Sequence, residues 1–170
     1  MKLFAQIIGL IAVATYLLSY QMKRRRQIIL VNATSSMLYV LQYVMLGAFE
    51  GAVIDVLSMI ATVTANNKDK QFIKNHTKLV FAIMNLSILI AGLALYKNIF
   101  SLFPIAGAIF QTSAFWISEE KKIRFISFLG SPFWLVYNIV SGAYGSAIGS
   151  LLALFSIGIA IYRYDIRKQK

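Results

Sequence analysis

The sequence has very little of the chemistry on which most enzyme sites depend. It contains no cysteine and a single histidine, His76. This excludes disulfides, thiolate metal sites and cysteine nucleophiles, and it leaves a histidine-based metal site without partners. A glycine-rich phosphate-binding loop is also missing, which argues against ATP-driven chemistry. We therefore expect no metal, no cofactor and no enzyme activity.

Two further classes of membrane protein are excluded by what the apolar runs lack. A retinal protein needs a lysine inside a span for its Schiff base, whereas every lysine here lies in a connection or at the end of a run. Hydrolysis inside a membrane needs a serine–histidine pair, a second buried aspartate or a metal cluster, and the runs contain none of these.

Apolar side chains are abundant where charge is scarce. They make up 59% of the 170 residues and charged residues only 14%, against roughly 45–50% and about 25% in soluble domains. A soluble domain of this size has too much surface to hide so many apolar side chains. We expect an all-α integral membrane protein in which residues 1–170 form a single transmembrane domain.

Seven apolar runs are each about 16–20 residues long, close to the roughly 17–25 that a helix needs to cross the hydrocarbon. Backbone polar groups in lipid must pair within the segment, so the runs predict seven transmembrane helices. The first run ends in KRRR, which is typical of a retained anchor rather than a cleaved signal. The runs cover residues 3–21, 28–47, 51–66, 79–96, 100–117, 125–141 and 145–162.

The positions of the basic residues predict the orientation. All lysines and arginines except Lys2 and Lys97 fall in the connections 22–27, 67–78 and 118–124 or in the C-terminal tail. With seven spans these four segments share one side, which the positive-inside rule assigns to the cytoplasm, leaving the N-terminus outside. Omitting the short third run would scramble this separation. The net charge of +11 thus predicts contact with anionic lipid headgroups rather than with nucleic acid.

An internal repeat appears when the sequence is shifted by 95 residues. SSMLYVLQYVMLGAFEGAVIDVL (35–57) then lies opposite GSPFWLVYNIVSGAYGSAIGSLL (130–152). This predicts a first repeat over 1–66, a linker helix over 79–96 and a second repeat over 97–163, with the two helix triplets parallel. A chance match of two apolar helices that end in Gly-Ala turns is the alternative. Identical pairs include Ser36 with Ser131, Gly47 with Gly142, Ala48 with Ala143, and Ala52 with Ala147.

This organisation resembles the SWEET/PQ-loop superfamily of transporters and, within it, most resembles the YgjV family of bacterial inner membrane proteins. The segments that carry the resemblance are QMKRRRQIILVN, LGAFEGA, GSPFWLVYNIVSGAYGSA and the final helix ending in YRY. It implies a 3+1+3 bundle in the bacterial inner membrane that transports by alternating access. Such bundles carry a hinge proline in the first helix of each repeat. Pro104 fits this pattern, whereas the first repeat has Gly9 and no PQ dipeptide.

Aromatic and amide side chains recur at matched positions of the two repeats. Tyr39, Gln42 and Tyr43 have the i, i+3, i+4 spacing of one helical face, and the shift places Trp134, Tyr137 and Asn138 opposite them. Rings stack on flat solutes and amides bond hydroxyl groups, so these faces predict a substrate site. The alternative is that they only hold helices together.

Asp55 is the acid that lies well inside a predicted span, and Ser58 follows it at i+3. Polar groups within lipid are costly and are therefore candidates for function. We expect Asp55 and Ser58 to contact a substrate or a coupling proton, unless Asp55 merely reaches headgroup water. Gln111, Thr112 and Ser113 are weaker candidates, because serine and threonine often bond their own helix.

Two functions follow from these patterns. The first is a secondary transporter or facilitator of a small polar metabolite, sugar-like or nucleoside-like, and the sequence is compatible with a homo-oligomer. The alternative is a receptor or scaffold that transports nothing. A wet cavity between the repeats would favour transport, and a dry packed seam would favour the scaffold.

Overall fold

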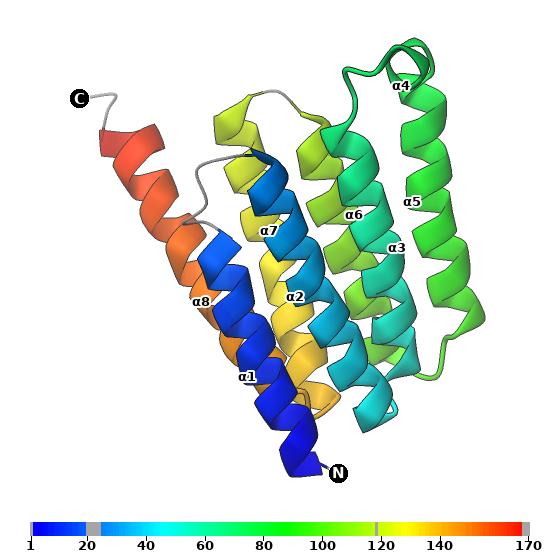
Figure 1. Ribbon diagram of the computed structural model, residues 1–170, viewed down its shortest axis with the longest axis vertical. Coiled ribbons are helices and arrows are strands. Elements are labelled where there is room, and N and C mark those ends of the chain that lie inside the picture. The colour runs from blue at the N-terminus through cyan, green and yellow to red at the C-terminus, as the bar shows by residue number, and fades with distance from the viewer. Residues whose placement is uncertain (1, 20–24, 118, 168–170) are drawn as a thin grey trace.

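The computed structural model describes residues 2–19, 25–117 and 119–167, and within these ranges it contains helices and no strand (Figure 1). This confirms the predicted all-α class. A 3-10 turn, Ile99–Ser101, precedes α6, and a π-helical turn, Ile161–Ile166, continues α8. The helices are α1 Lys2–Ser19, α2 Arg25–Leu46, α3 Phe49–Asn66, α4 Gln71–Asn75, α5 Thr77–Ala94, α6 Leu102–Trp116, α7 Glu120–Val140 and α8 Tyr144–Ala160.

Of the described segments, 5 are long and apolar enough to cross a membrane. The first two predicted spans correspond to shorter apolar stretches, Lys2–Leu18 and Ala33–Leu46. The five spanning segments are Phe49–Asn66, Thr77–Ala94, Ile99–Trp116, Lys121–Val140 and Tyr144–Arg163.

The helices begin earlier than the apolar runs suggested, which corrects the predicted connections 22–27 and 118–124. Arg25 and Arg26 belong to α2, and Lys121, Lys122 and Arg124 belong to α7. Lysine and arginine have good helix propensity, so a charged first turn does not end a helix. The expected connection 67–78 also contains the short helix α4.

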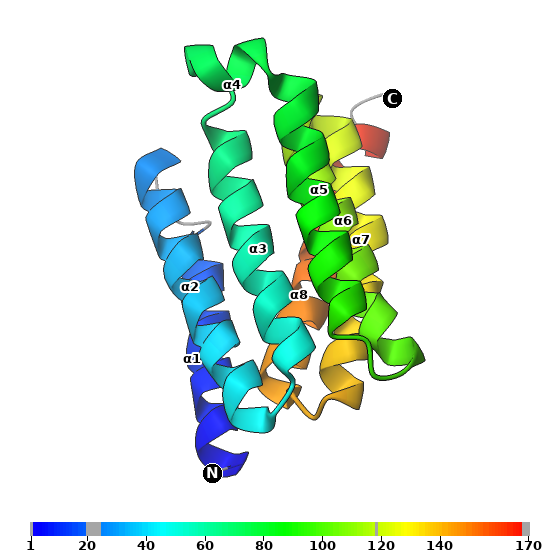
Figure 2. The same cartoon turned by 90° about the vertical axis from the view of Figure 1, so that its right-hand side faces the viewer.

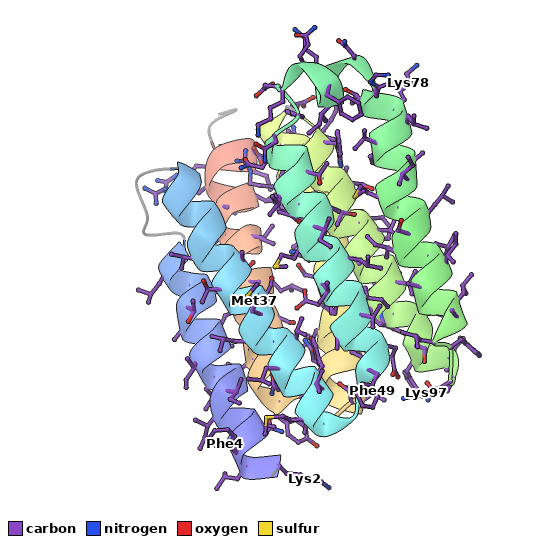
Figure 3. All side chains as sticks on the ribbon, turned by 45° about the vertical axis from the view of Figure 1, so that its right-hand side comes forward. Lys2, Phe4, Met37, Phe49, Lys78 and Lys97 are labelled. Atoms are coloured by element: carbon purple, nitrogen blue, oxygen red, sulfur yellow. The ribbon has the colours of Figure 1, made fainter. Side chains whose placement is uncertain are left out.

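Large apolar side chains point away from the bundle along its whole length. Phe4, Met37 and Phe49 are 60%, 62% and 52% exposed, and all three project outward in Figure 3. In α5, Ile88 and Gly92 are buried and the other residues are exposed or partly exposed. Such an outer surface requires lipid as its solvent.

The helices run roughly parallel in one bundle (Figures 1 and 2). Their contacts arrange six of them as a closed ring. Helix α1 packs against α2 and α8, α2 against α3, α3 against α6, α6 against α7, and α7 against α8. Helix α5 lies outside the ring against α3 and α6. The ring therefore places α1–α3 and α6–α8 around a shared interior.

Two glycines end α2 and α7 with the same turn. Gly47 and Gly142 have φ values of 74° and 72°, in the left-handed region that glycine tolerates. In each turn the next N–H bonds back to a helix carbonyl, Ala48 to Tyr43 at 2.9 Å and Ala143 to Asn138 at 2.8 Å. This is the Schellman arrangement, which satisfies carbonyls left open at a helix end.

The two ends of the ring differ in charge. The N-terminus, the Gly47 and Gly142 turns and Lys97 lie at one end, called the glycine end here (Figures 1 and 3). The C-terminus, α4 and Lys78 lie at the other, called the basic end. The lysines and arginines that the structure describes, apart from Lys2 and Lys97, belong to the segments at the basic end.

Candidate functional site

A cavity of about 720 Å³ lies inside the ring. All six ring helices line it and α5 does not. Its lining reaches the basic end at Asn66, Lys68 and Arg124 and extends inward to Tyr43 and Asn138. Other polar lining residues are Ser36, Asp55, Ser58, Thr62, Gln111, Thr112, Ser127, Ser131, Ser146 and Ser150.

A direct bond between the two halves closes the inner end of the cavity. The Tyr43 hydroxyl donates to Asn138 Oδ1 at 2.6 Å, and Asn138 Nδ2 donates to Ser150 Oγ at 3.0 Å. The Tyr43 ring lies near that of Trp134, with centroids 6.5 Å apart and planes 21° from parallel. The inner end thus combines flat aromatic faces with amide and hydroxyl groups.

Beyond this bond, a buried glutamine ties α2 to α8 and α1. The Ser146 hydroxyl donates to Gln42 Oε1 at 2.5 Å, and Gln42 Nε2 donates to Gln6 Oε1 at 3.3 Å. Gln6 bonds the turn of the second half, donating to the Gly142 carbonyl at 2.7 Å and accepting from the Gly145 N–H at 3.0 Å. A Cβ on Gly145 would lie 2.8 Å from the Gly9 Cα, so the two helix backbones approach closely here.

A second set of contacts joins α3 to α7 and to the connection before α6. The Gly51 N–H donates to the Tyr137 hydroxyl at 2.9 Å. Glu50, in the first turn of α3, forms an ion pair with Lys97 at 3.1 Å. A carboxylate also suits a helix N-terminus electrostatically. Together these contacts close the glycine end across both halves.

Asp55 lies in the cavity wall, nearly two turns into α3. Its Oδ2 is buried and has no hydrogen-bond partner among the described residues. Ser58, on the same face, donates its hydroxyl to the Ile54 carbonyl of its own helix at 2.7 Å. The carboxylate is therefore available to whatever enters the cavity.

An ion pair between α7 and the chain beyond α8 marks the mouth of the cavity. Arg124 binds Asp165 through two of its nitrogens, Nε at 2.9 Å and Nη2 at 2.6 Å. The hydrogen bonds from this guanidinium hold the pKa of the Asp165 carboxyl below its ordinary value. Bidentate geometry makes this a well-defined contact.

The structure brings together most of the side chains that the sequence singled out, but not all of them. Tyr39, Tyr43, Asp55, Ser58, Trp134 and Asn138 line the cavity, as do Gln111 and Thr112. Gln42 and Tyr137 do not. Gln42 is fully buried against α1 and α8, and Tyr137 faces the Gly51 turn. Residues three and four apart diverge enough around a helix to reach different neighbours.

The hinge role of Pro104 and Gly9 stays a prediction, and both residues lie where helices pack closely. Pro104 lies in the first turn of α6, where its missing N–H breaks no bond within that helix. Gly9 sits where α1 meets Gly145, and a Cβ there would clash with Gln42. Pro132 lies inside α7, where proline does remove a helix bond.

Several residues of the site were missed from the sequence. Gln6, Glu50 and Ser146 hold the glycine end together. The repeat offered a signal for the cavity, because the identical pair Ser36 and Ser131 lines it from both halves. No three His, Asp or Glu side chains gather as a metal would require within the described ranges.

The chain matches the family model Imp-YgjV, bacterial inner membrane protein, over residues 3–168. It therefore belongs to this family, as the resemblance indicated, and its apolar helices fit a multi-pass protein of the inner membrane. No curated protein and no solved structure matches it.

Proposed function

We propose that the chain is a secondary transporter or facilitator that moves a small polar solute across the bacterial inner membrane by alternating access. The observation that carries this proposal is the cavity of about 720 Å³ with polar and aromatic walls from every ring helix. Its volume falls within the roughly 300–1,000 Å³ of small-molecule sites. A scaffold needs no such space between its helices.

The proposed topology has seven spans in a 3+1+3 arrangement, as in the SWEET/PQ-loop superfamily. Helices α1–α3 and α6–α8 form the repeats, and α5 is the linker. The basic end faces the cytoplasm and its anionic headgroups, with the N-terminus outside. The ring order supports this proposal, because α3 packs on α6 as α8 packs on α1.

Contacts across the ring also follow the shift of 95 residues. Tyr43 bonds Asn138, its own counterpart in the other half. The shift pairs Gln42 with Tyr137 and Gly51 with Ser146. Gln42 of the first half bonds Ser146 of the second, and in the equivalent contact Tyr137 of the second half bonds Gly51 of the first. A twofold pseudo-axis between Tyr43 and Asn138 accounts for all three contacts.

The geometry supports a simple transport cycle. In the state described, the cavity reaches the basic end and the glycine end is closed. Opening the other side requires the Tyr43–Asn138, Gln42–Ser146 and Gly51–Tyr137 contacts to separate, because each joins the two halves. The solute then crosses as the repeats rock about the pseudo-axis.

A thermal-shift screen of metabolites on the detergent-purified protein tests the proposal. A ligand that binds only the folded protein raises its melting temperature. For such a ligand, Trp134→Ala and Asn138→Ala should each weaken binding by about 5- to 150-fold, since lost stacking or amide contacts cost about 1–3 kcal/mol.

Ile139→Ala is the matched control, since Ile139 adjoins Asn138 but is 51% exposed on the outside. It should leave the ligand shift unchanged. The scaffold alternative predicts that no small molecule shifts the melting temperature of the wild-type protein.

A further inference from the structure

We propose that the solute is a small organic cation, a protonated amine or a quaternary ammonium compound, and that Asp55 binds its positive charge. This deepens the proposed function and rests on it. It replaces a neutral sugar-like solute with a charged one.

The first observation is the unpaired carboxylate. Asp55 Oδ2 is buried in the cavity wall and has no hydrogen-bond partner among the described residues. A buried carboxylate without a donor or a countercharge is unfavourable. An isolated charge of this kind within a membrane protein marks a place where a partner of opposite charge binds.

The second observation is that the Tyr43 hydroxyl, which lines the same cavity, is already used. Tyr43 has one O–H, and Asn138 accepts it. In the other half, Asn138 donates to Ser150, the counterpart of Asp55 under the shift of 95 residues. The equivalent bond in the first half would run from Tyr43, the counterpart of Asn138, to Asp55. The Tyr43–Asn138 bond therefore leaves the carboxylate for a ligand.

The third observation is the charge of the cavity along its length. Lys68 follows the end of α3, about 20 Å from Asp55 along the helix axis at 1.5 Å per residue. Arg124, at the mouth, is paired with Asp165. The inner end consequently holds a net negative charge, and an anionic solute would be repelled there.

Aromatic faces beside the carboxylate suit the same class of solute. Tyr43 and Trp134 stack at 6.5 Å, and both line the cavity with Asp55. The face of an aromatic ring attracts ammonium groups, alkylated ones in particular. A carboxylate and two aromatic rings in the wall of one cavity provide both charge and shape for such a group.

The natural absence of cysteine makes a direct test available. Ser58→Cys and, separately, Ser150→Cys place one thiol in the cavity wall on either side. Each purified variant is treated with a cationic and an anionic thiol reagent of similar size, the trimethylammonium-ethyl and sulfonatoethyl methanethiosulfonates. The ratio of the two rates is divided by the same ratio for a free thiol in solution.

We expect the normalised ratio to favour the cation on the order of tenfold at both positions, as a nearby unit charge in a partly wet site would cause. Adding Asp55→Asn should bring it close to one. Ser127→Cys, nearer the mouth, is the matched control and should change little with Asp55→Asn.

The outcomes separate the two proposals. Thiols that react equally with both reagents, or a preference that Asp55→Asn leaves intact, would overturn the cationic solute and leave the cavity in place. Thiols at both positions that react with neither reagent, in protein that remains monodisperse, would remove the cavity and the proposed function with it.

Discussion

The two ends of the helix ring are built from different kinds of contact. At the glycine end, helix backbones touch at Gly9 and Gly145, and buried side chains such as Gln42 bond across the halves. At the basic end, the cavity reaches the surface and its mouth is marked by the ion pair of Arg124 with Asp165. Close contacts therefore join the two halves at the glycine end, whereas the ion pair at the mouth lies within the second half.

This difference indicates that most of the free energy that holds the two halves together comes from contacts at the glycine end. Close packing and buried hydrogen bonds are sensitive to the loss or gain of a single atom. Partly exposed ion pairs contribute little and weaken with salt. Variants at the glycine end should therefore have larger effects than variants at the basic end.

The largest effect is expected for Gly145→Ala. The new Cβ would lie 2.8 Å from the Gly9 Cα, a backbone atom that cannot rotate away. Overpacking of this kind should lower the free energy of unfolding by about 3 kcal/mol, measured by denaturation in detergent. Gly158→Ala in the same helix is the control, because its Cβ would meet only Phe128 at 3.8 Å. Equal losses in the two variants would contradict the close contact.

A smaller loss is expected for Tyr43→Phe. It leaves Asn138 Oδ1 without its donor at 2.6 Å, which should cost about 1–2 kcal/mol of unfolding free energy. Tyr144→Phe removes an exposed hydroxyl and should cost nothing measurable. In a double-mutant cycle, Tyr43→Phe and Asn138→Ala should lose less together than the sum of the two. Additive losses would show that the bond contributes nothing.

Lys97→Met should have a weaker effect, below about 1 kcal/mol. The lysine side chain is 55% exposed although Glu50 is 10% exposed, so solvent screens much of the attraction. High salt should reduce the difference between variant and wild type. Lys2→Met provides an exposed control at the same end. A loss of several kcal/mol would place this ion pair among the main contacts of the glycine end.

Asp165→Asn should also have a small effect, with a defined pH dependence. Arg124 lowers the pKa of Asp165 in the folded protein, so its contribution is present above the ordinary carboxyl pKa and is lost as pH falls through the lowered value. The variant should melt slightly below the wild type at pH 7, and the two should converge in acid. A difference that grows as pH falls would contradict the sign of this shift.

Much of the fold follows from the sequence, because apolar runs and basic clusters record which segments lipid can cover. The sequence repeat pairs Gly47 with Gly142, and in the structure both glycines form the same turn. Helix starts were predicted less well, because basic residues such as Arg25 and Lys121 fit a first helical turn as well as the connection before it.

The site was only partly predictable. Tyr39, Tyr43, Asp55 and Trp134 were found because polar and aromatic groups stand out in apolar runs, and all four line the cavity. Gln42 and Tyr137 shared that signal, yet packing turns them toward other helices. Gln6 was missed, since its partners Gly142 and Gly145 lie far along the chain and offer only backbone groups.

The central claim, a cavity that opens at a cytoplasmic basic end while the glycine end is closed, is tested most directly by Ser150→Cys. The variant is labelled with a membrane-impermeant maleimide, once in inverted inner-membrane vesicles and once in spheroplasts, which expose opposite faces. The account predicts that the thiol reacts in inverted vesicles and is protected in spheroplasts. Reaction in spheroplasts with protection in inverted vesicles, or protection in both, would contradict it.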